Sequence, residues 1–229
     1  MFVGEKKSGK SSLITKFLDQ QVKDELPETT AMEFRSSEKK NKDDKKVKVN
    51  CYELGGGRAF SNLLESAIVG GSIHQTTVVI VIDLSKPGNA IDNLLYWLNS
   101  VREQSQTALE NLQSTNQEAF ITMKKRIQAK WHSHEDVKQI NVSMVPIVIL
   151  GSKFDLFANQ SDSRSKKLLC MALRYIAHVN TCDLVFGSVR EKLPSQLYRS
   201  VLNSYAFEQE LTHMDLNHMN PICCPASKD

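Results

Sequence analysis

The sequence predicts an α/β fold in which a mostly parallel central sheet lies between two layers of helices. Apolar runs of strand length recur along the chain, over residues 46–54, 76–83, 144–151 and 182–187. Segments with apolar side chains at helical spacing alternate with these runs, around residues 91–101, 169–176 and 197–205. Strands that alternate with helices pair in parallel, and strands that are apolar on both sides need helices on both faces. We therefore expect three layers.

A glycine-rich loop near the start of the chain indicates where this fold binds a ligand. Residues 4–11 read GEKKSGKS and match the phosphate-binding pattern G-x-x-x-x-G-K-[ST]. Phe2 and Val3 precede the loop as the end of a buried strand, and residues 11–20 follow it with apolar side chains at helical spacing. The sequence thus predicts a loop whose backbone N–H groups and following helix N-terminus face a phosphate group.

The side chains of this loop suit a nucleotide with a magnesium ion. Lys10 can reach the outer phosphates, and the hydroxyl of Ser11 can face the metal. Strands usually have about five or six residues, but only three precede Gly4, so we expect a short first strand or a truncated chain. The loop residues expected to bind the nucleotide are Gly4, Ser8, Gly9, Lys10, Ser11 and Ser12.

Two further positions are candidates for sensing a γ-phosphate at the carboxyl ends of the strands. Thr29 stands in a polar loop after the first helix, where its hydroxyl can join Ser11 as a magnesium ligand; the alternative is an ordinary loop threonine. The segment YELGGGR (52–58) ends the next strand, and there Glu53 and Gly56 can serve as the acidic residue and the γ-phosphate sensor.

The segment GSKFD (151–155) is the candidate site for the base of the nucleotide. It follows an apolar run directly, so its polar side chains lie at the carboxyl end of a strand. A carboxylate can accept two hydrogen bonds from the guanine ring. Lys153 and Asp155 are therefore predicted to bind guanine.

We expect one domain over residues 1–208 and a flexible tail over 209–229, where the apolar periodicity is lost. The domain contains a polar insert at about 102–134 whose second half has an apolar helical stripe beside basic residues. Such a stripe fits packing on its own domain or docking on another protein.

A mixed-charge stretch at 36–48 predicts a solvated hairpin tip between two strands.

The composition of the chain excludes some classes of partner and indicates its location in the cell. The 229 residues are 41% hydrophobic and 24% charged, with a net charge of +3, which is too small an excess to predict nucleic acid or an anionic membrane as a partner. We also expect no membrane insertion, because the longest apolar run is far shorter than the roughly 18 residues of a membrane span. The odd number of cysteines, five, fits a protein whose thiols stay reduced, as they do in the cytoplasm. The composition favours a soluble cytoplasmic protein.

The order and spacing of these elements, from about residue 3 to 207, resemble the Ras-like GTPase domain. The resemblance implies a guanine nucleotide, GTP or GDP, with Mg²⁺. Four departures matter: Glu53 replaces an aspartate, Gly57 replaces the glutamine that orients the attacking water, Ser152 replaces the asparagine before Lys153, and FGSVR (186–190) is a reduced base-binding element. Glycine cannot orient water, so we expect a degenerate domain without hydrolysis.

Four segments are similar to the light intermediate chains of cytoplasmic dynein 2: YELGGG, VIDLSKP (81–87), VPIVILGSKFD (145–155) and LRYIAHV (173–179). This resemblance implies a non-catalytic subunit that binds the tail of the dynein 2 heavy chain, works with the other subunits and supports retrograde intraflagellar transport and cilium assembly. It implies a location in the cytoplasm, the cytoskeleton, and the cilium and its base. The alternative is a slow Ras-like guanine-nucleotide switch that acts independently of dynein. Family members have more residues before the phosphate-binding loop and a longer C-terminal part.

Overall fold

A seven-stranded sheet forms the centre of the protein, with the strand order β2-β3-β1-β4-β5-β6-β7. The computed structural model describes residues 1–19, 27–40, 44, 46–132, 134–160, 162–209, 211–226 and 228. β1, β3, β4, β5 and β6 run parallel, whereas β2 and β7 are antiparallel to their neighbours at the two edges. The strands are β1 (Phe2–Gly4), β2 (Met32–Lys40), β3 (Lys46–Leu54), β4 (Val78–Asp83), β5 (Ile147–Ser152), β6 (Asp183–Phe186) and β7 (Cys223–Cys224).

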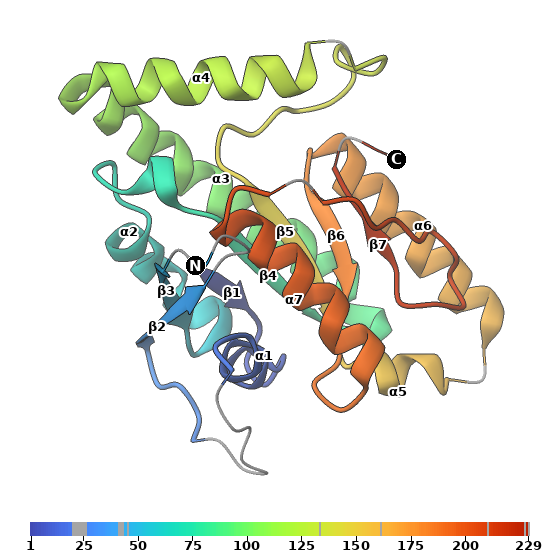
Figure 1. Cartoon of the computed structure of the whole chain (residues 1–229). Helices are drawn as coiled ribbons and strands as arrows, with labels where there is room; N and C mark the ends of the chain where they lie inside the picture. Colours follow the sequence, from blue (N-terminus) through green and yellow to red (C-terminus); the bar gives the residue numbers. More distant parts are fainter. Residues whose placement is uncertain are drawn as a thin grey trace.

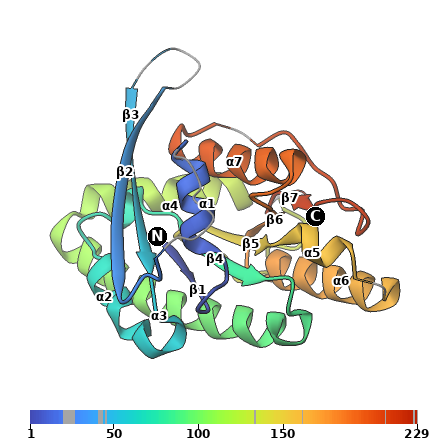
Figure 2. The same ribbon diagram turned by 90° about the horizontal axis from the view of Figure 1, so that it is seen from below.

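Helices cover both faces of this sheet, as Figures 1 and 2 show. α1 and α7 lie on one face, and α2, α3 and α6 lie on the other. Three 3₁₀ turns, η1 (Gly57–Leu63), η2 (Ile73–Gln75) and η3 (Pro87–Asn89), connect the elements. The helices are α1 (Lys10–Phe17), α2 (Leu64–Ala67), α3 (Ala90–Thr115), α4 (Gln117–Trp131), α5 (Phe154–Ala158), α6 (Ser163–Val179) and α7 (Lys192–Ala206).

The central strand β4 shows why helices are needed on both sides. Successive side chains of a strand point to opposite faces. Val79 and Val81 belong to the core beneath α1 and α7, whereas Val78, Ile80 and Ile82 belong to the core beneath α3 and α6, and all five are buried. The three-layer fold with a mostly parallel sheet is confirmed.

The predicted hairpin around 36–48 is formed by β2 and β3, which pair from Met32–Leu54 to Lys40–Lys46. The strands extend further into the charged stretch than we expected, because alternate residues such as Lys39, Val49 and Cys51 cover one face of the ribbon while their neighbours face water. Of the tip, residues 41–43 and 45 lie outside the described residues.

The C-terminal segment differs from the flexible tail that we expected over 209–229. Residues 222–226 are buried, and Cys223 and Cys224 pair with β6 as β7. The side chain of Asp183 on β6 ties this segment and α7 together, since it accepts hydrogen bonds from Ala226 N at 2.8 Å and from the hydroxyl of Tyr205 on α7 at 2.7 Å. Without β7, the backbone groups at the edge of β6 would lack partners. Flexibility is therefore the wrong description of residues 222–226.

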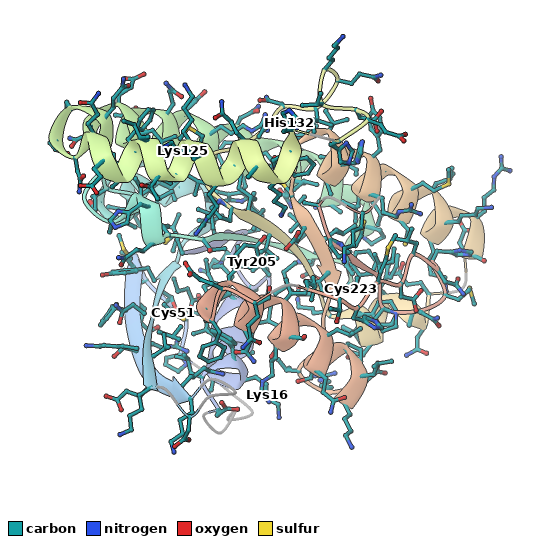
Figure 3. All side chains as sticks on the ribbon, turned by 45° about the horizontal axis from the view of Figure 1, so that its top comes forward. Lys16, Cys51, Lys125, His132, Tyr205 and Cys223 are labelled. Carbon is teal, nitrogen blue, oxygen red and sulfur yellow. The ribbon has the colours of Figure 1, made fainter. Side chains whose placement is uncertain are left out.

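All five cysteines are free and buried. Figure 3 labels Cys51 and Cys223; Cys223 lies in the core beneath α7, to which Tyr205 also contributes. Burial raises the pKa of the Cys170 thiol to about 11. Burial, and then Asp183 and Asp215, raise the pKa of Cys223 to about 12.

We therefore expect the native protein to react very slowly with iodoacetamide at pH 8, because a thiol with a pKa of about 11 is about 0.1% thiolate there and is also shielded from the reagent. Mass spectrometry before and after unfolding in guanidinium measures this. All five thiols should react after unfolding, and fast native labelling of Cys223 would show that β7 opens readily.

The predicted helical insert consists of the end of α3 and of α4, which crosses one end of the molecule in Figure 1. The Asn116 side chain begins α4 by accepting a hydrogen bond from Ala119 N at 3.1 Å. Met123 and Trp131 are buried, so the apolar side of α4 packs on its own domain. Docking on another protein would have to use the exposed side.

Replacing Trp131 by alanine should lower the free energy of unfolding by about 3 kcal/mol, the usual scale for a buried tryptophan. Trp131 packs with Ile140 and Ala226, and so ties α4 to the C-terminal segment. Thermal melting measures the loss, with Lys124→Ala on the exposed side of α4 as the control. Equal melting of both variants would contradict the packing role.

Candidate functional site

The loop of residues 4–11 connects β1 to α1 and has the backbone that a phosphate cradle needs. Gly4 and Gly9 have φ angles of 144° and 91°, in a region that side chains disfavour. A Cβ at Gly4 would lie 2.3 Å from the carbonyl oxygen of Val81 on β4. The loop is thus held tightly against the sheet, and α1 begins directly after it at Lys10.

The side chain of Lys10 lies inside this loop. It is buried, and its Nζ donates to the carbonyl oxygens of Gly4 at 3.1 Å and Glu5 at 2.9 Å. Burial lowers the pKa of Lys10, and the nearby carboxylates of Glu53 and Glu5 oppose this shift. A cation that is held at the inside of the loop is placed to meet an anion there.

Two serines complete the cradle. The Ser8 hydroxyl is buried and has no hydrogen-bond partner among the described residues, which is costly unless a ligand supplies one. The Ser152 hydroxyl lies 2.6 Å from the carbonyl oxygen of Ser8 and 3.1 Å from that of Ile82. Ser152 therefore braces the loop from the end of β5, although it replaces the asparagine of the guanine-binding pattern.

The two candidate magnesium ligands bind different carboxylates. Ser11 Oγ donates to Glu53 Oε1 at 2.6 Å, and Thr29 Oγ1 donates to Glu33 Oε2 at 3.1 Å. Glu53 is only 3% exposed, and its second oxygen, Oε2, makes no hydrogen bond to any described residue. The two hydroxyls therefore bond to neighbouring carboxylates, because Glu33 and Glu53 are opposite each other in the β2–β3 register.

Arg35 on β2 links these groups, although the sequence did not predict it as part of the site. Its Nε and Nη2 donate to the two oxygens of Glu33 at 2.8 and 2.9 Å, which lowers the pKa of Glu33. Its Nη1 donates to Ser11 O at 3.2 Å and to Thr15 Oγ1 at 2.8 Å, and Nη2 lies 3.6 Å from Glu53 Oε2. No motif signals this residue, since only the strand register, Glu33 opposite Glu53, brings it to the loop.

These residues fit a phosphate group, whereas for Mg²⁺ they offer only the oxygens of Ser11 and Glu53. The loop offers backbone N–H groups, Lys10 and the unpartnered Ser8 hydroxyl to an anion. The Ser11 hydroxyl donates its proton to Glu53, which leaves its oxygen lone pairs free, while the Arg35 guanidinium lies against the Ser11 carbonyl oxygen. Among the described residues, no group of three or more His, Cys, Asp or Glu side chains could hold a metal ion.

The loops that carry Thr29 and Gly56 close on the phosphate-binding loop. A Cβ at Gly55 would lie 2.1 Å from the carbonyl oxygen of Thr29, so these two loops touch through their backbones. A Cβ at Gly57 would lie 2.9 Å from Glu5 Oε2, so the residue in the place of the water-orienting glutamine packs on the phosphate-binding loop. Arg58 strengthens this contact by donating to Glu5 Oε1 at 2.8 Å.

The guanine-binding candidates Lys153 and Asp155 lie directly after β5, and the segment that follows β6 contacts them. Lys153 Nζ donates to Lys7 O at 3.0 Å and to Asp83 Oδ2 at 2.5 Å, and so joins the phosphate-binding loop to β4. Asp155 Oδ1 accepts a hydrogen bond from the Ser188 hydroxyl at 2.6 Å. Ser188 belongs to the reduced segment FGSVR, which therefore still orients the aspartate.

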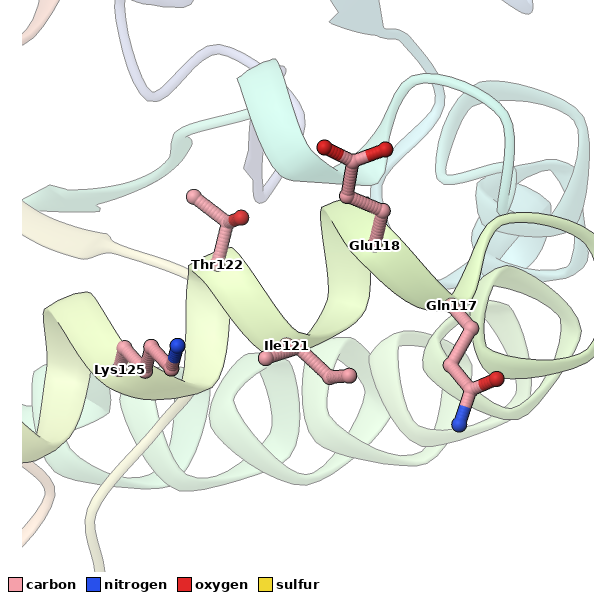
Figure 4. Close-up of a pocket in the computed structure, with 5 residues that line it drawn as sticks. All are labelled: Gln117, Glu118, Ile121, Thr122 and Lys125. Atoms are coloured by element: carbon pink, nitrogen blue, oxygen red, sulfur yellow. The ribbon is translucent and has the colours of Figure 1, made fainter.

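A hollow elsewhere on the surface is a weaker candidate for a ligand site than the phosphate-binding loop. Figure 4 shows its lining, Gln117, Glu118, Ile121, Thr122 and Lys125, which all come from α4. One helix face without convergent groups from other elements gives no basis for a ligand. No helix within the described ranges is long and apolar enough to cross a membrane.

Comparisons with known proteins agree with this geometry. Residues 1–112 match the family model described as Roc, the Ras of Complex domain of DAPkinase. The chain also has the fold of a solved structure described as the dynein light intermediate chain's conserved domain, with a TM-score of 0.69 and 16% identity over 100% of this chain and 80% of that one. This likeness shows the fold.

Sequence relatives identify the family more closely. The chain is 31% identical to cytoplasmic dynein 2 light intermediate chain 1 of Danio rerio over 100% of its length and 63% of the relative, and 32% identical to that of Homo sapiens over 90% and 58%. It thus spans less than two thirds of the length of these relatives. The chain is a homologue of the cytoplasmic dynein 2 light intermediate chains and has the P-loop GTPase-like α/β fold that the sequence predicted.

Proposed function

We propose that this chain is a non-catalytic subunit of the cytoplasmic dynein 2 motor complex. In this role it binds the tail of the heavy chain and works with the other subunits in retrograde intraflagellar transport and cilium assembly. Its place is then the cytoplasm and cytoskeleton, and the cilium and its base. The observation that carries the proposal is the similarity to dynein 2 light intermediate chains over 90–100% of this chain.

The site supports a role without hydrolysis. Gly57 has no side chain that could orient a water molecule, and its backbone packs on Glu5. The Thr29 hydroxyl is bonded to Glu33, so its proton is already used within the protein. A bound GTP or GDP then acts as a stabilising ligand: at about 100 times its Kd it adds about 2.7 kcal/mol to the free energy of unfolding.

Recovery of the heavy chain tests this proposal. The tagged wild-type chain and its Lys10→Ala variant are purified from ciliated cells, with a tagged Ras-like GTPase as the control, and both heavy chain and retained nucleotide are measured. We expect both forms to recover the dynein 2 heavy chain equally, and the control to recover none. Failure of both forms to recover it would overturn the proposal, and recovery by the wild type alone would favour a nucleotide-dependent switch.

A further inference from the structure

We propose that the outer face of α6 binds an amphipathic helix of another protein, with apolar residues at heptad spacing and acidic residues beside them. α6 (Ser163–Val179) lies at the outside of the molecule in Figures 1 and 2. It packs on the face of the sheet opposite α1, so this surface is separate from the phosphate-binding loop. The inference goes beyond the proposed function and holds with or without a bound nucleotide.

α6 has apolar side chains on two opposite sides, although a surface helix needs only one such side to pack on its domain. The inner side is buried and consists of Leu169, Cys170, Leu173 and Ala177. The outer side carries Leu168, Met171 and Tyr175, which are 58%, 55% and 70% exposed. Large apolar residues that are exposed together on one helix face are typical of an interaction site.

The outer side of α6 has the spacing of a helix pair. Leu168, Met171 and Tyr175 follow one another at intervals of three and four residues, the positions a, d and a of a heptad. Arg164 occupies the preceding position d, where its aliphatic stem can continue the line. Position g, directly beside the line, is Lys167. An apolar line confined to a and d is the seam at which two helices pack, since a helix on a broader surface also uses e or g.

The charge of α6 indicates what such a partner helix carries. Within α6 the Lys and Arg residues are Arg164, Lys166, Lys167 and Arg174, and there is no Asp or Glu. Lys166 donates to the carbonyl oxygen of Ala158 at 3.0 Å. Arg164 and Lys167, in contrast, are exposed and form no ion pair with any described residue. Carboxylates along the edge of a partner helix would pair with these two cations.

The same features argue against two other occupants of this face. Two copies of α6 packed along the seam would bring together helices that are both basic and carry no acidic residue, and such like charges disfavour a contact. An anionic membrane would attract the cations, but a helix that lies in a membrane buries a broad apolar face. The outer side of α6 exposes three large apolar side chains in a narrow line.

Calorimetric titration of the full chain with two synthetic peptides tests the inference. Both peptides are about four heptads long with Leu at a and d, and one has Glu while the other has Lys at e and g. We expect the acidic peptide to bind at least about tenfold more tightly than the basic one, and less so as NaCl screens the charges. Replacing Met171 and Tyr175 together by Gln should weaken its binding at least about tenfold. Arg164→Glu combined with Lys167→Glu should reverse the preference between the peptides.

Leu95→Gln is the matched control, because Leu95 is 45% exposed on α3, outside the seam, and its loss should change the affinity by less than about twofold. Thermal melting checks that each variant folds, as expected for exposed positions. Equal binding of both peptides, no binding of the acidic peptide, or unchanged binding after the change at Met171 and Tyr175 would each overturn the inference. It would also be overturned if that change abolished binding to phosphatidylserine vesicles or self-association, because the face would then belong to a membrane or to a second copy.

Discussion

Replacing Gly4 by alanine should destabilise this protein strongly, although the change adds only one methyl group. The added Cβ would lie 2.3 Å from the carbonyl oxygen of Val81, at a φ angle of 144° that alanine disfavours. The clash costs about 1–3 kcal/mol and the backbone angle about 1–3 kcal/mol, so the free energy of unfolding should fall by about 2–6 kcal/mol. Thermal melting should show a drop on the order of 10 °C.

Gly88→Ala is the matched control for this substitution, because a Cβ there would meet no atom within 4 Å. Its melting temperature should stay within about 2 °C of the wild type, as for most surface changes. If Gly4→Ala melted like Gly88→Ala, the close packing of the phosphate-binding loop on β4 would be wrong.

Replacing Lys10 by alanine should lower the affinity for GTP or GDP by about 100-fold. Loss of a buried, charge-assisted contact costs about 2–5 kcal/mol, and the Lys10 ammonium lies inside the loop on the carbonyl oxygens of Gly4 and Glu5. Titration with a fluorescent guanine nucleotide measures the change. Unchanged affinity would show that this loop is not the site.

Lys6→Ala is the control for charge, because Lys6 stands in the same loop but its ammonium faces Glu28 at 2.8 Å with 60% of the side chain exposed. Exposed ion pairs contribute about 0–1 kcal/mol, so the affinity should change by less than about fivefold. An equal loss in both variants would mean that the loop acts by its net charge and that the position of Lys10 is not special.

Much of the fold followed from local patterns. The apolar run at 76–83 became β4, and the stripe at 91–101 became the first part of α3, because burial between two helical layers requires apolar residues at these periods. The phosphate-binding loop could also be predicted from the sequence, because its residues are contiguous and each has a definite role. Leu95 is an exception: it shares the stripe of α3 but is 45% exposed.

The sequence by itself thus determined the three layers, the phosphate-binding loop and the absence of a side chain at Gly57. Only the tertiary structure decided that Cys223 and Cys224 complete the sheet and that Arg35 stands beside Ser11, 24 residues away. The Ser188–Asp155 contact likewise joins two strand ends. These features depend on strand register and on which edge lacks a partner, and such long-range pairings leave no periodic signal in a single sequence.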